Sequence, residues 1–553
     1  MKKILFSALL AFAAISVMAE RADYRIIPLP KSVQTDSTKV FVLRANMGIA
    51  YDASDPEQAR NAQFLRGWIE ELTGIKLQMT PADKQAAIRL SLIVDKKGKK
   101  TKKGAEPTAQ QQEAYTISID QSGIVLQARQ PVGLFRAAQT LRKALPIVNT
   151  GQSFISVEFP YAQIQDEPRF TYRGVMLDCA RHYFKVDVIK RYIDVMALHG
   201  CNQLHWHLTE DQGWRFEVKV LPELAKKGSI REQTVIGHNT GVYDGQRYGG
   251  YYTQEQCREI VNYAAERYIN IIPEIDLPGH MLGALHVFPN LGCTGGPYPV
   301  WEHWGVSREV LCAGNPETMT FLKTVVGELC DVFPSKFIHI GGDECPKDRW
   351  KNCPKCQAKA AELGLTADEK HSVENQLQTY INHEMEAFLR ERGRDMIGWD
   401  EVLEGGLTEG GIVMSWRGIK GGIEAAKQHH RVIMSPNSYC YIDYYQLKDQ
   451  RQQPEAIGGY LPTSKVYSFE PLIPESLTDE EQQYILGPQV NLWTEYVGAP
   501  QHIFYMLLPR LDAISEVQWC RSDQKNFEDF QTRLPRMFRL YDRIGINYCH
   551  KIE

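Results

Sequence analysis

Short apolar runs alternate with amphipathic stretches from about residue 170 to the C-terminus. Between many of the runs lie stretches with helical periodicity, namely Val186–Leu198, Gln254–Arg267, Glu317–Val332 and Val373–Arg392. The runs predict eight strands: Gly174–Leu177, Gln203–Leu208, Ile269–Ile275, Phe337–Ile340, Met396–Trp399, Ile412–Trp416, Val432–Ser435 and Gln489–Trp493. Repeated strand-then-helix units indicate a parallel sheet, and eight of them fit a (β/α)8 TIM barrel with long loops.

Residues 20–165 show a different pattern, which predicts a smaller α/β domain. Ile88–Val94 is typical of a strand, and Tyr115–Ile119 and Ile124–Ala128 flank a turn as in a hairpin. Val132–Leu145 has helical periodicity. The polar, proline-containing segment Gln165–Arg169 is the predicted boundary, so residues 166–553 should form the barrel with C-terminal helices.

The N-terminus has the features of a secretory signal. Lys2 and Lys3 precede the apolar stretch Ile4–Val17, and small residues allow cleavage after Ala19. The stretch is shorter than the roughly 20 residues that a membrane helix needs. We therefore expect residues 1–19 to be a signal peptide and the mature protein to be exported, periplasmic or secreted, with no membrane span.

The net charge of the chain argues against one class of partner. The formal net charge of the 553 residues is −4, which argues against a nucleic-acid partner. The basic run Lys96–Lys103 lacks aromatic residues, so we expect a solvated hairpin tip there. No heptad pattern indicates an oligomeric state.

Twelve cysteines in a long exported chain allow some disulfides without implying a disulfide scaffold. Cys293 and Cys312 bracket a loop rich in Gly, Pro and Trp and could staple it. Cys353 and Cys356, close to Cys345, have the spacing of a zinc knuckle or a redox pair. Because a second pair at matching spacing is missing, we expect a local disulfide or free thiols rather than zinc.

The chemistry-bearing residues follow the predicted strands. The run Phe337–Ile340 ends in two glycines and the adjacent acids Asp343 and Glu344. Paired carboxylates suit glycoside hydrolysis, since one can stay protonated as the acid while the other stays charged. Tryptophans lie at three more strand ends, Trp399, Trp416 and Trp493. Aromatic faces pack against sugar rings, so the pattern favours a sugar pocket at the C-terminal ends of the strands.

The residues around these strands resemble those of glycoside hydrolase family 20, the β-N-acetylhexosaminidases, over about residues 168–520. The resemblance rests on the segments Arg173–Gly174, Asp178–His182, His205–Gln212, Pro278–His280, His339–Glu344 and Leu492–Glu495. It implies an exo-acting, retaining enzyme for terminal β-linked GlcNAc or GalNAc. The substrate's own 2-acetamido oxygen would attack the anomeric carbon, an exception to the usual two-carboxylate scheme. It implies no cofactor and no catalytic metal.

By motif position, the resemblance assigns two groups of residues. Glu344 would be the general acid and then the base, with Asp343 and Tyr441 on the acetamido group and His280 and Glu210 as a relay behind Glu344. The sugar would be held by Arg181, Trp399, Trp416, Asp443, Phe469, Trp493 and Glu495. Two residues depart from the family: Glu210 stands where Asp is common, and Phe469 where some relatives have Trp. These departures affect subsite preference and pH optimum rather than the reaction.

Other interpretations remain open from the residues alone. His205 and His207 could be core residues satisfied by backbone partners, or could bind zinc with Asp343 in a metal-dependent amidohydrolase. A non-catalytic sugar-binding protein is a third possibility. Asp178 either forms a structural ion pair with Arg173 or Arg181 or contacts substrate.

Overall fold

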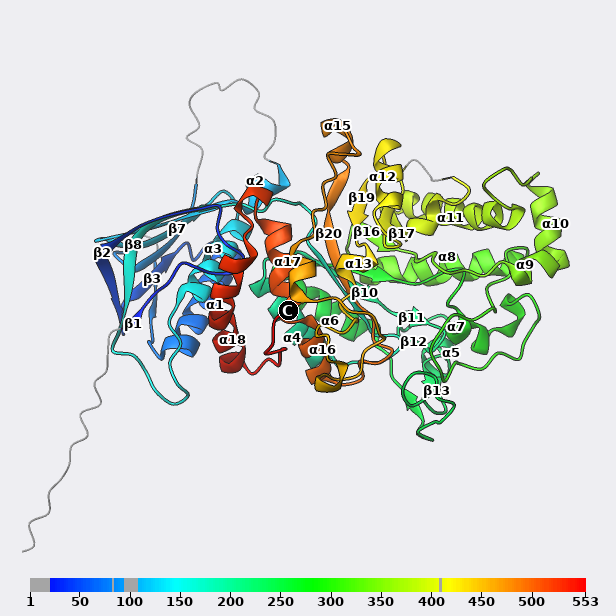
Figure 1. Ribbon diagram of the computed structural model, residues 1–553, viewed down its shortest axis with the longest axis horizontal. Coiled ribbons are helices and arrows are strands. Elements are labelled where there is room, and N and C mark those ends of the chain that lie inside the picture. The colour runs from blue at the N-terminus through cyan, green and yellow to red at the C-terminus, as the bar shows by residue number, and fades with distance from the viewer. Residues whose placement is uncertain (1–19, 82–83, 94–107, 407–409) are drawn as a thin grey trace, which may run out of the picture. The chain divides into compact units, whose positions relative to one another are not determined.

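The computed structural model describes residues 20–81, 84–93, 108–406 and 410–553 (Figure 1). The predicted signal peptide and the basic run Lys96–Lys103 lie outside these residues. The chain divides into two compact units, one built mainly from residues 32–101 and 115–166, the other mainly from residues 167–553.

The first unit is an eight-stranded mixed sheet. Its path runs β1-β8-β6-β7-β5-β3-β4, and β2 pairs with β8. The strands are β1 Glu20–Arg21, β2 Ser32–Arg44, β3 Gly48–Tyr51, β4 Gln78–Pro81, β5 Ile88–Leu92, β6 Tyr115–Asp120, β7 Gly123–Ala128 and β8 Ser156–Asp166. Helices α1 (Pro56–Thr73) and α3 (Pro131–Ala144) pack on each other and on this sheet.

The hairpin and the helix predicted in this unit are confirmed. Strands β6 and β7 are antiparallel, with Asp120 opposite Gly123 at the turn. Gly123 has φ of 132°, and a Cβ there would lie 2.6 Å from the carbonyl oxygen of Ala87, so the turn requires glycine. Burial alternates along β6, as period-2 patterning demands.

The second unit contains a closed barrel of eight parallel strands, which confirms the predicted TIM barrel. The strands are β9 Gly174–Asp178, β10 Gln203–His207, β15 Asn270–Glu274, β16 Phe337–His339, β17 Asp395–Trp399, β18 Ile412–Ser415, β19 Val432–Met434 and β20 Ile485–Leu492, and β20 closes onto β9. They are buried on both faces because helices cover the outside of the barrel.

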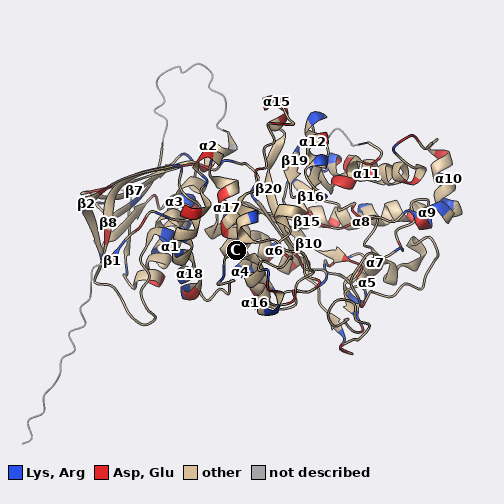
Figure 2. Ribbon diagram, viewed as in Figure 1, with Lys and Arg blue, Asp and Glu red and all other residues tan. Residues whose placement is uncertain are grey.

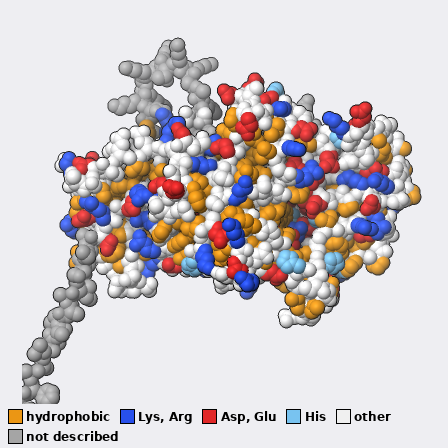
Figure 3. Space-filling model, viewed as in Figure 1, with side chains coloured by type: hydrophobic (Ala, Val, Ile, Leu, Met, Phe, Trp, Pro, Cys, Tyr) orange, Lys and Arg blue, Asp and Glu red, His pale blue; other side chains and the backbone are white. Residues whose placement is uncertain are grey.

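The predicted helices also form, with ends that differ by one or two residues. They are α4 Val186–Leu198, α6 Gln254–Ala265, α8 Pro316–Val332 and α11 Val373–Glu391; further helices are α12 Lys420–Lys427, α16 Pro500–Leu507, α17 Arg510–Trp519 and α18 Phe527–Ile544. A search of the described residues finds no helix with the length and apolar character needed to cross a membrane. Acidic and basic side chains are scattered along the helices (Figure 2), and both signs mingle on the face shown in Figure 3.

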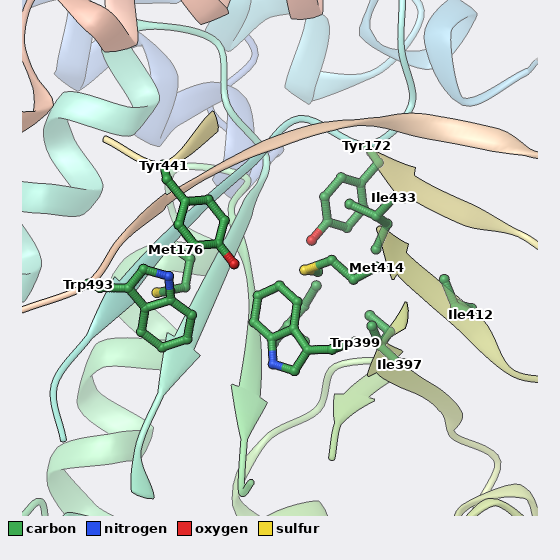
Figure 4. Packing of buried hydrophobic residues seen from close by; sticks show 10 residues of the cluster. Tyr172, Met176, Ile397, Trp399, Ile412, Met414, Ile433, Tyr441 and Trp493 are labelled. Carbon is green, nitrogen blue, oxygen red and sulfur yellow. The ribbon is translucent and has the colours of Figure 1, made fainter. Parts of the chain in front are cut away.

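One part of the barrel interior is an apolar cluster with an aromatic end. Met176, Met414 and Ile433 belong to a buried cluster that also contains aromatic residues from several strand ends. Figure 4 shows the hydroxyl of Tyr441 pointing toward the indoles of Trp399 and Trp493. The aromatic side chains therefore gather where the strands deliver their C-terminal residues.

Candidate active site

The adjacent acids follow β16 through a turn that only glycine permits. Gly341 and Gly342 have φ of 67° and 97°. A Cβ on Gly341 would lie 1.9 Å from Oδ1 of Asp276. Glu344 also has positive φ, 45°, which costs energy for a residue with a side chain and is typical of functional sites. The backbone thus carries strain at the point where it presents the two acids.

Asp343 is a nearly buried carboxylate, 9% exposed, beside a second one. Burial and the charge of Asp343 raise the pKa of Asp276 well above its usual range. Burial also raises the pKa of Asp343, and the His280 cation opposes this. Among the described residues, Oδ1 of Asp343 has no hydrogen-bond partner. Asp343 therefore has an oxygen available for a ligand.

His280 lies between the acid pair and Glu210, as the predicted relay requires. Its Nδ1 is 2.9 Å from Glu210 Oε2, and its Nε2 is 3.9 Å from Asp343 Oδ2 and 3.7 Å from Glu344 Oε2. Burial disfavours a charge on His280, but Glu210 and Asp276 outweigh it and raise its pKa well above the usual range. His280 is therefore a buried cation facing both acids.

Glu344 differs from Asp343 in its environment. Its side chain is 45% exposed. Partial burial and then the charge of Asp343 raise its pKa, while His280 and Arg181 act in the other direction. A raised pKa keeps a carboxyl protonated nearer neutral pH, as a general acid requires. The two adjacent acids thus differ in exposure, and the pKa of each is raised.

Arg181 joins residues from three strand ends. Its guanidinium lies 2.7 Å from Glu210, 3.3 Å from Asp178 and 3.9 Å from Glu495, and over the ring of Trp493. Asp178 also accepts from the backbone and hydroxyl of Thr494, 3.2 and 3.0 Å away. Asp178 therefore pairs with Arg181, whereas Arg173 pairs with Glu113 at 2.6 Å.

Asp443 and Glu495 are carboxyls whose charges act on each other. Asp443 is 3% exposed, and its Oδ1 has no hydrogen-bond partner among the described residues. Burial and the charge of Glu495 raise the pKa of Asp443 well above its usual range. A buried polar oxygen without a partner costs free energy, which a bound hydroxyl would recover.

The predicted aromatic wall forms from four residues. Trp399 and Trp493 are 5.9 Å apart between ring centroids, and Tyr441 lies 6.3 Å from Trp493 and stacks on Trp416 at 6.0 Å. Burial raises the pKa of Tyr441 well above its usual range, so its hydroxyl is a donor at any working pH. The wall combines apolar faces with one fixed hydroxyl.

Phe469 is the one predicted sugar-binding residue that the structure does not bring into this network. Its ring is 2% exposed and stacks on Tyr439 at 5.0 Å, and Lys525 donates to its carbonyl. No described contact joins it to the acids or the tryptophans. Its role toward substrate stays a prediction.

Glu274, to which the sequence analysis gave no role, is the centre of a buried polar cluster under the acids. His205 Nε2, His207 Nδ1 and His339 Nδ1 lie 2.7, 2.6 and 3.0 Å from its carboxylate. Trp399 Nε1 also donates to it, at 3.0 Å. His205 and His207 are core residues, as one interpretation had them, but they contact a side-chain carboxylate from the neighbouring strand rather than the backbone.

Glu274 and His207 form an ion pair within this cluster. Glu274 keeps a pKa well below its usual range, because its three histidines outweigh the cost of burial. Glu274 and Glu210 likewise raise the pKa of His207 to about 10 against the effect of burial, while burial lowers that of His205 to about 4. The side chains of Glu274, His205 and His207 all have 0% exposure, whereas a catalytic metal site keeps an open position for water. This geometry does not favour the amidohydrolase interpretation.

Glu401 is a further acid near the site, and the sequence analysis gave it no role. It accepts from Trp416 Nε1 at 3.0 Å. Burial and the charge of Asp343 raise its pKa to about 8, although Arg417 opposes them. Its neighbour Asp400 instead holds the backbone of Trp416, at 3.0 Å. Asp400 and Glu401 are adjacent in the chain, and only the folded structure shows that the charge of Asp343 acts on Glu401.

Comparisons with known proteins agree with this geometry. The profile of glycosyl hydrolase family 20, catalytic domain, matches residues 170–522, and that of glycosyl hydrolase family 20, domain 2, matches residues 23–167. A beta-hexosaminidase of Porphyromonas gingivalis is 38% identical, over 99% of this chain and 68% of that protein.

Solved structures give the same result. The exo beta-N-acetylglucosaminidase of Vibrio harveyi in complex with N-acetylglucosamine is 28% identical, with a TM-score of 0.80 over 96% of this chain and 79% of that one. A mutant beta-hexosaminidase of Streptomyces plicatus in complex with product GlcNAc is 28% identical, with a TM-score of 0.79 over 95% and 96% of the two chains. Barrel, acid pair and matches together show that the chain belongs to glycosyl hydrolase family 20.

Proposed function

We propose that this protein is an exo-acting β-N-acetylhexosaminidase that removes terminal β-linked GlcNAc or GalNAc from glycans with retention of configuration. The observation that carries the proposal is the pair Asp343 and Glu344, one nearly buried and the other half-exposed with a raised pKa. The relatives named beta-hexosaminidase, and the neighbours that bind N-acetylglucosamine, support the substrate class.

In the proposed first step the two acids act together. Glu344 donates its proton to the glycosidic oxygen as the bond to C1 breaks, and the 2-acetamido oxygen attacks C1. The resulting oxazolinium ion carries a positive charge. Asp343 accepts the acetamido N–H and stabilises this charge, while Tyr441 donates to the acetamido oxygen. In the second step Glu344 takes a proton from water, which attacks C1 and reopens the ring.

The remaining residues fix the sugar. Trp399, Trp416 and Trp493 wall the acetamido group and the pyranose ring. Arg181, Asp443 and Glu495 bind hydroxyls of the terminal sugar, and the room around its 4-hydroxyl sets the tolerance for GalNAc. Residues 292–314 border the leaving-group side.

We also propose the division into residues 20–165 as an accessory domain and 166–553 as the catalytic domain. Export to the periplasm, or secretion, after cleavage near Ala19 fits the polar and apolar pattern of the N-terminus.

The test is hydrolysis of p-nitrophenyl β-N-acetylglucosaminide by wild type, Glu344→Gln and Asp343→Asn, with EDTA present. We expect wild-type turnover and a loss of roughly 10²-fold or more in each variant, because each removes a group that acts only in the transition state. Added azide should rescue Glu344→Gln on this substrate, whose leaving group needs no acid, and should not rescue Asp343→Asn. An inactive wild type, or variants near the wild-type rate, would contradict the proposal.

A further inference from the structure

Four cysteines meet in the loops that follow β15 and β16. Gly292 and Leu311 form an antiparallel bridge, and each precedes one cysteine of the cluster, Cys293 and Cys312. The backbone N–H of Cys312 donates to Leu291 at 2.7 Å. One half of the cluster therefore lies on two bridged segments, and its two thiols are free rather than joined in the staple that the sequence allowed.

The other half is the Cys-x2-Cys pair that the sequence analysis left without a partner. Cys353 is the N-cap of α10 (Pro354–Glu362), and Cys356 lies in its first turn. A helix N-terminus favours thiolates, because its free N–H groups carry partial positive charge. Gly314 lets the two segments touch: a Cβ there would lie 2.0 Å from the carbonyl oxygen of Lys355. The backbone is thus built to bring the two pairs together.

The distances between the sulfurs are those of a shared ligand. Cys293 Sγ is 3.8 Å from Cys356 Sγ, and Cys312 Sγ is 3.7 Å from Cys353 and 3.6 Å from Cys356. Four thiolates at about 2.3 Å from a tetrahedral zinc ion lie about 3.8 Å from one another. A disulfide instead brings two sulfurs to about 2 Å and uses each once. Here Cys312 and Cys356 each contact two other sulfurs.

The surroundings are those of a structural site rather than of reactive thiols. Three of the four cysteines are buried, at 4% exposure or less, and Cys293 is partly buried. Four thiolates are a ligand set that selects zinc over hard cations. The donor atoms all lie within 4.8 Å of one another, as one ion requires.

We propose that this chain binds one structural zinc ion through four thiolates, those of Cys293, Cys312, Cys353 and Cys356. The ion ties residues 292–314 to the segment that begins just after Glu344. Trp350 Nε1 donates to Leu311 at 2.9 Å across the same junction. The zinc takes no part in hydrolysis; it fixes the loop that borders the leaving-group side of the acids.

The direct test is the metal and thiol content of the full-length wild-type chain, purified without reductant or chelator. We expect about one zinc per chain by plasma mass spectrometry, and twelve alkylatable thiols after unfolding in iodoacetamide. Two disulfides would leave four fewer thiols and would overturn the proposal. So would twelve free thiols in a chain that takes up no zinc when zinc is added.

Variants show where the metal binds. Cys353→Ser and Cys356→Ser should lower bound zinc at least tenfold, with Cys330→Ser, a buried cysteine on α8, as the matched control that keeps it. Loss of zinc should also expose residues 292–314 to limited proteolysis. Full zinc content in both cluster variants would overturn the assignment. If these variants fail to fold, cobalt loading of the wild type decides the matter, because tetrahedral thiolate coordination gives visible absorption bands. None of these measurements depends on hydrolytic activity, so their outcome is independent of the proposed function.

Discussion

Replacing His280 with asparagine tests the electrostatics of the acid pair. His280 has φ of 51°, a conformation that asparagine tolerates better than most residues. The asparagine amide can still donate to Glu210, as His280 Nδ1 does at 2.9 Å. The substitution therefore keeps the backbone and one hydrogen bond but removes the positive charge that faces Asp343 and Glu344.

The distances set an upper limit for the effect. His280 Nε2 and Asp343 Oδ2 are 3.9 Å apart. At an effective dielectric constant of about 20, their attraction is about 4 kcal/mol, equivalent to a factor of about 10³. The cation lowers the pKa of both Asp343 and Glu344, so its removal raises both. Because Asp343 must be ionised and Glu344 protonated, both limbs of the pH profile should move to higher pH.

The assay is kcat/KM for p-nitrophenyl β-N-acetylglucosaminide across the pH range in which wild type and variant stay folded. We expect a loss on the order of 10²- to 10³-fold at acidic pH that shrinks as pH rises. His502→Asn is the control, since burial keeps that histidine neutral, with a pKa of about 4. A variant profile parallel to wild type at every pH would refute the reasoning, because a merely structural defect would lower the whole curve equally.

Three further substitutions test other parts of the site. Glu401→Gln should gain thermal stability relative to wild type between pH 5 and pH 8 in scanning fluorimetry. Burial raises the pKa of Glu401 in the folded protein to about 8. The stability that protonated Glu401 contributes is therefore fully present below its unfolded pKa and is lost as pH rises through 8. An unchanged stability difference across that range would contradict this. Glu274→Gln should lower the free energy of unfolding by about 3–5 kcal/mol in urea titration, because it leaves His207 a buried, uncompensated cation; a change below 1 kcal/mol would show that the cluster is not an ion pair. Gly341→Ala should lower kcat by about 10²-fold with smaller change in KM, since a Cβ 1.9 Å from Asp276 must displace the acids; wild-type kcat would show that the turn tolerates a side chain.

The barrel could be predicted from the sequence because most of its parallel strands are buried on both faces and are therefore largely apolar runs. The exception is β20, which begins four residues before the predicted Gln489. Gly487 and Pro488 interrupt its apolar pattern, and Gly487 has φ of 148° where the register with β19 shifts. In the first unit, β2 and β8 were not predicted, because polar residues interrupt both strands.

The site was predictable only where a motif carried it. The pair Asp343 and Glu344 and the relay through His280 follow from local segments. The partner of His207 does not: register pairs His207 with Glu274 across β10 and β15, and no pattern within either strand shows that register. The same holds for Cys293 and Cys312, whose distance from Cys353 along the chain concealed a four-sulfur cluster.

The shared partners of Arg181 have a consequence for the evolution of specificity. One guanidinium contacts carboxylates from the ends of β9, β10 and β20, so no single change there alters one contact without disturbing the other two. The pocket for the terminal sugar is therefore inherited as a unit. The loop of residues 292–314 contributes none of these contacts, so its residues other than the two cysteines are free to diverge. Close relatives should therefore differ in the leaving groups that they accept, while the terminal sugar that they remove stays the same.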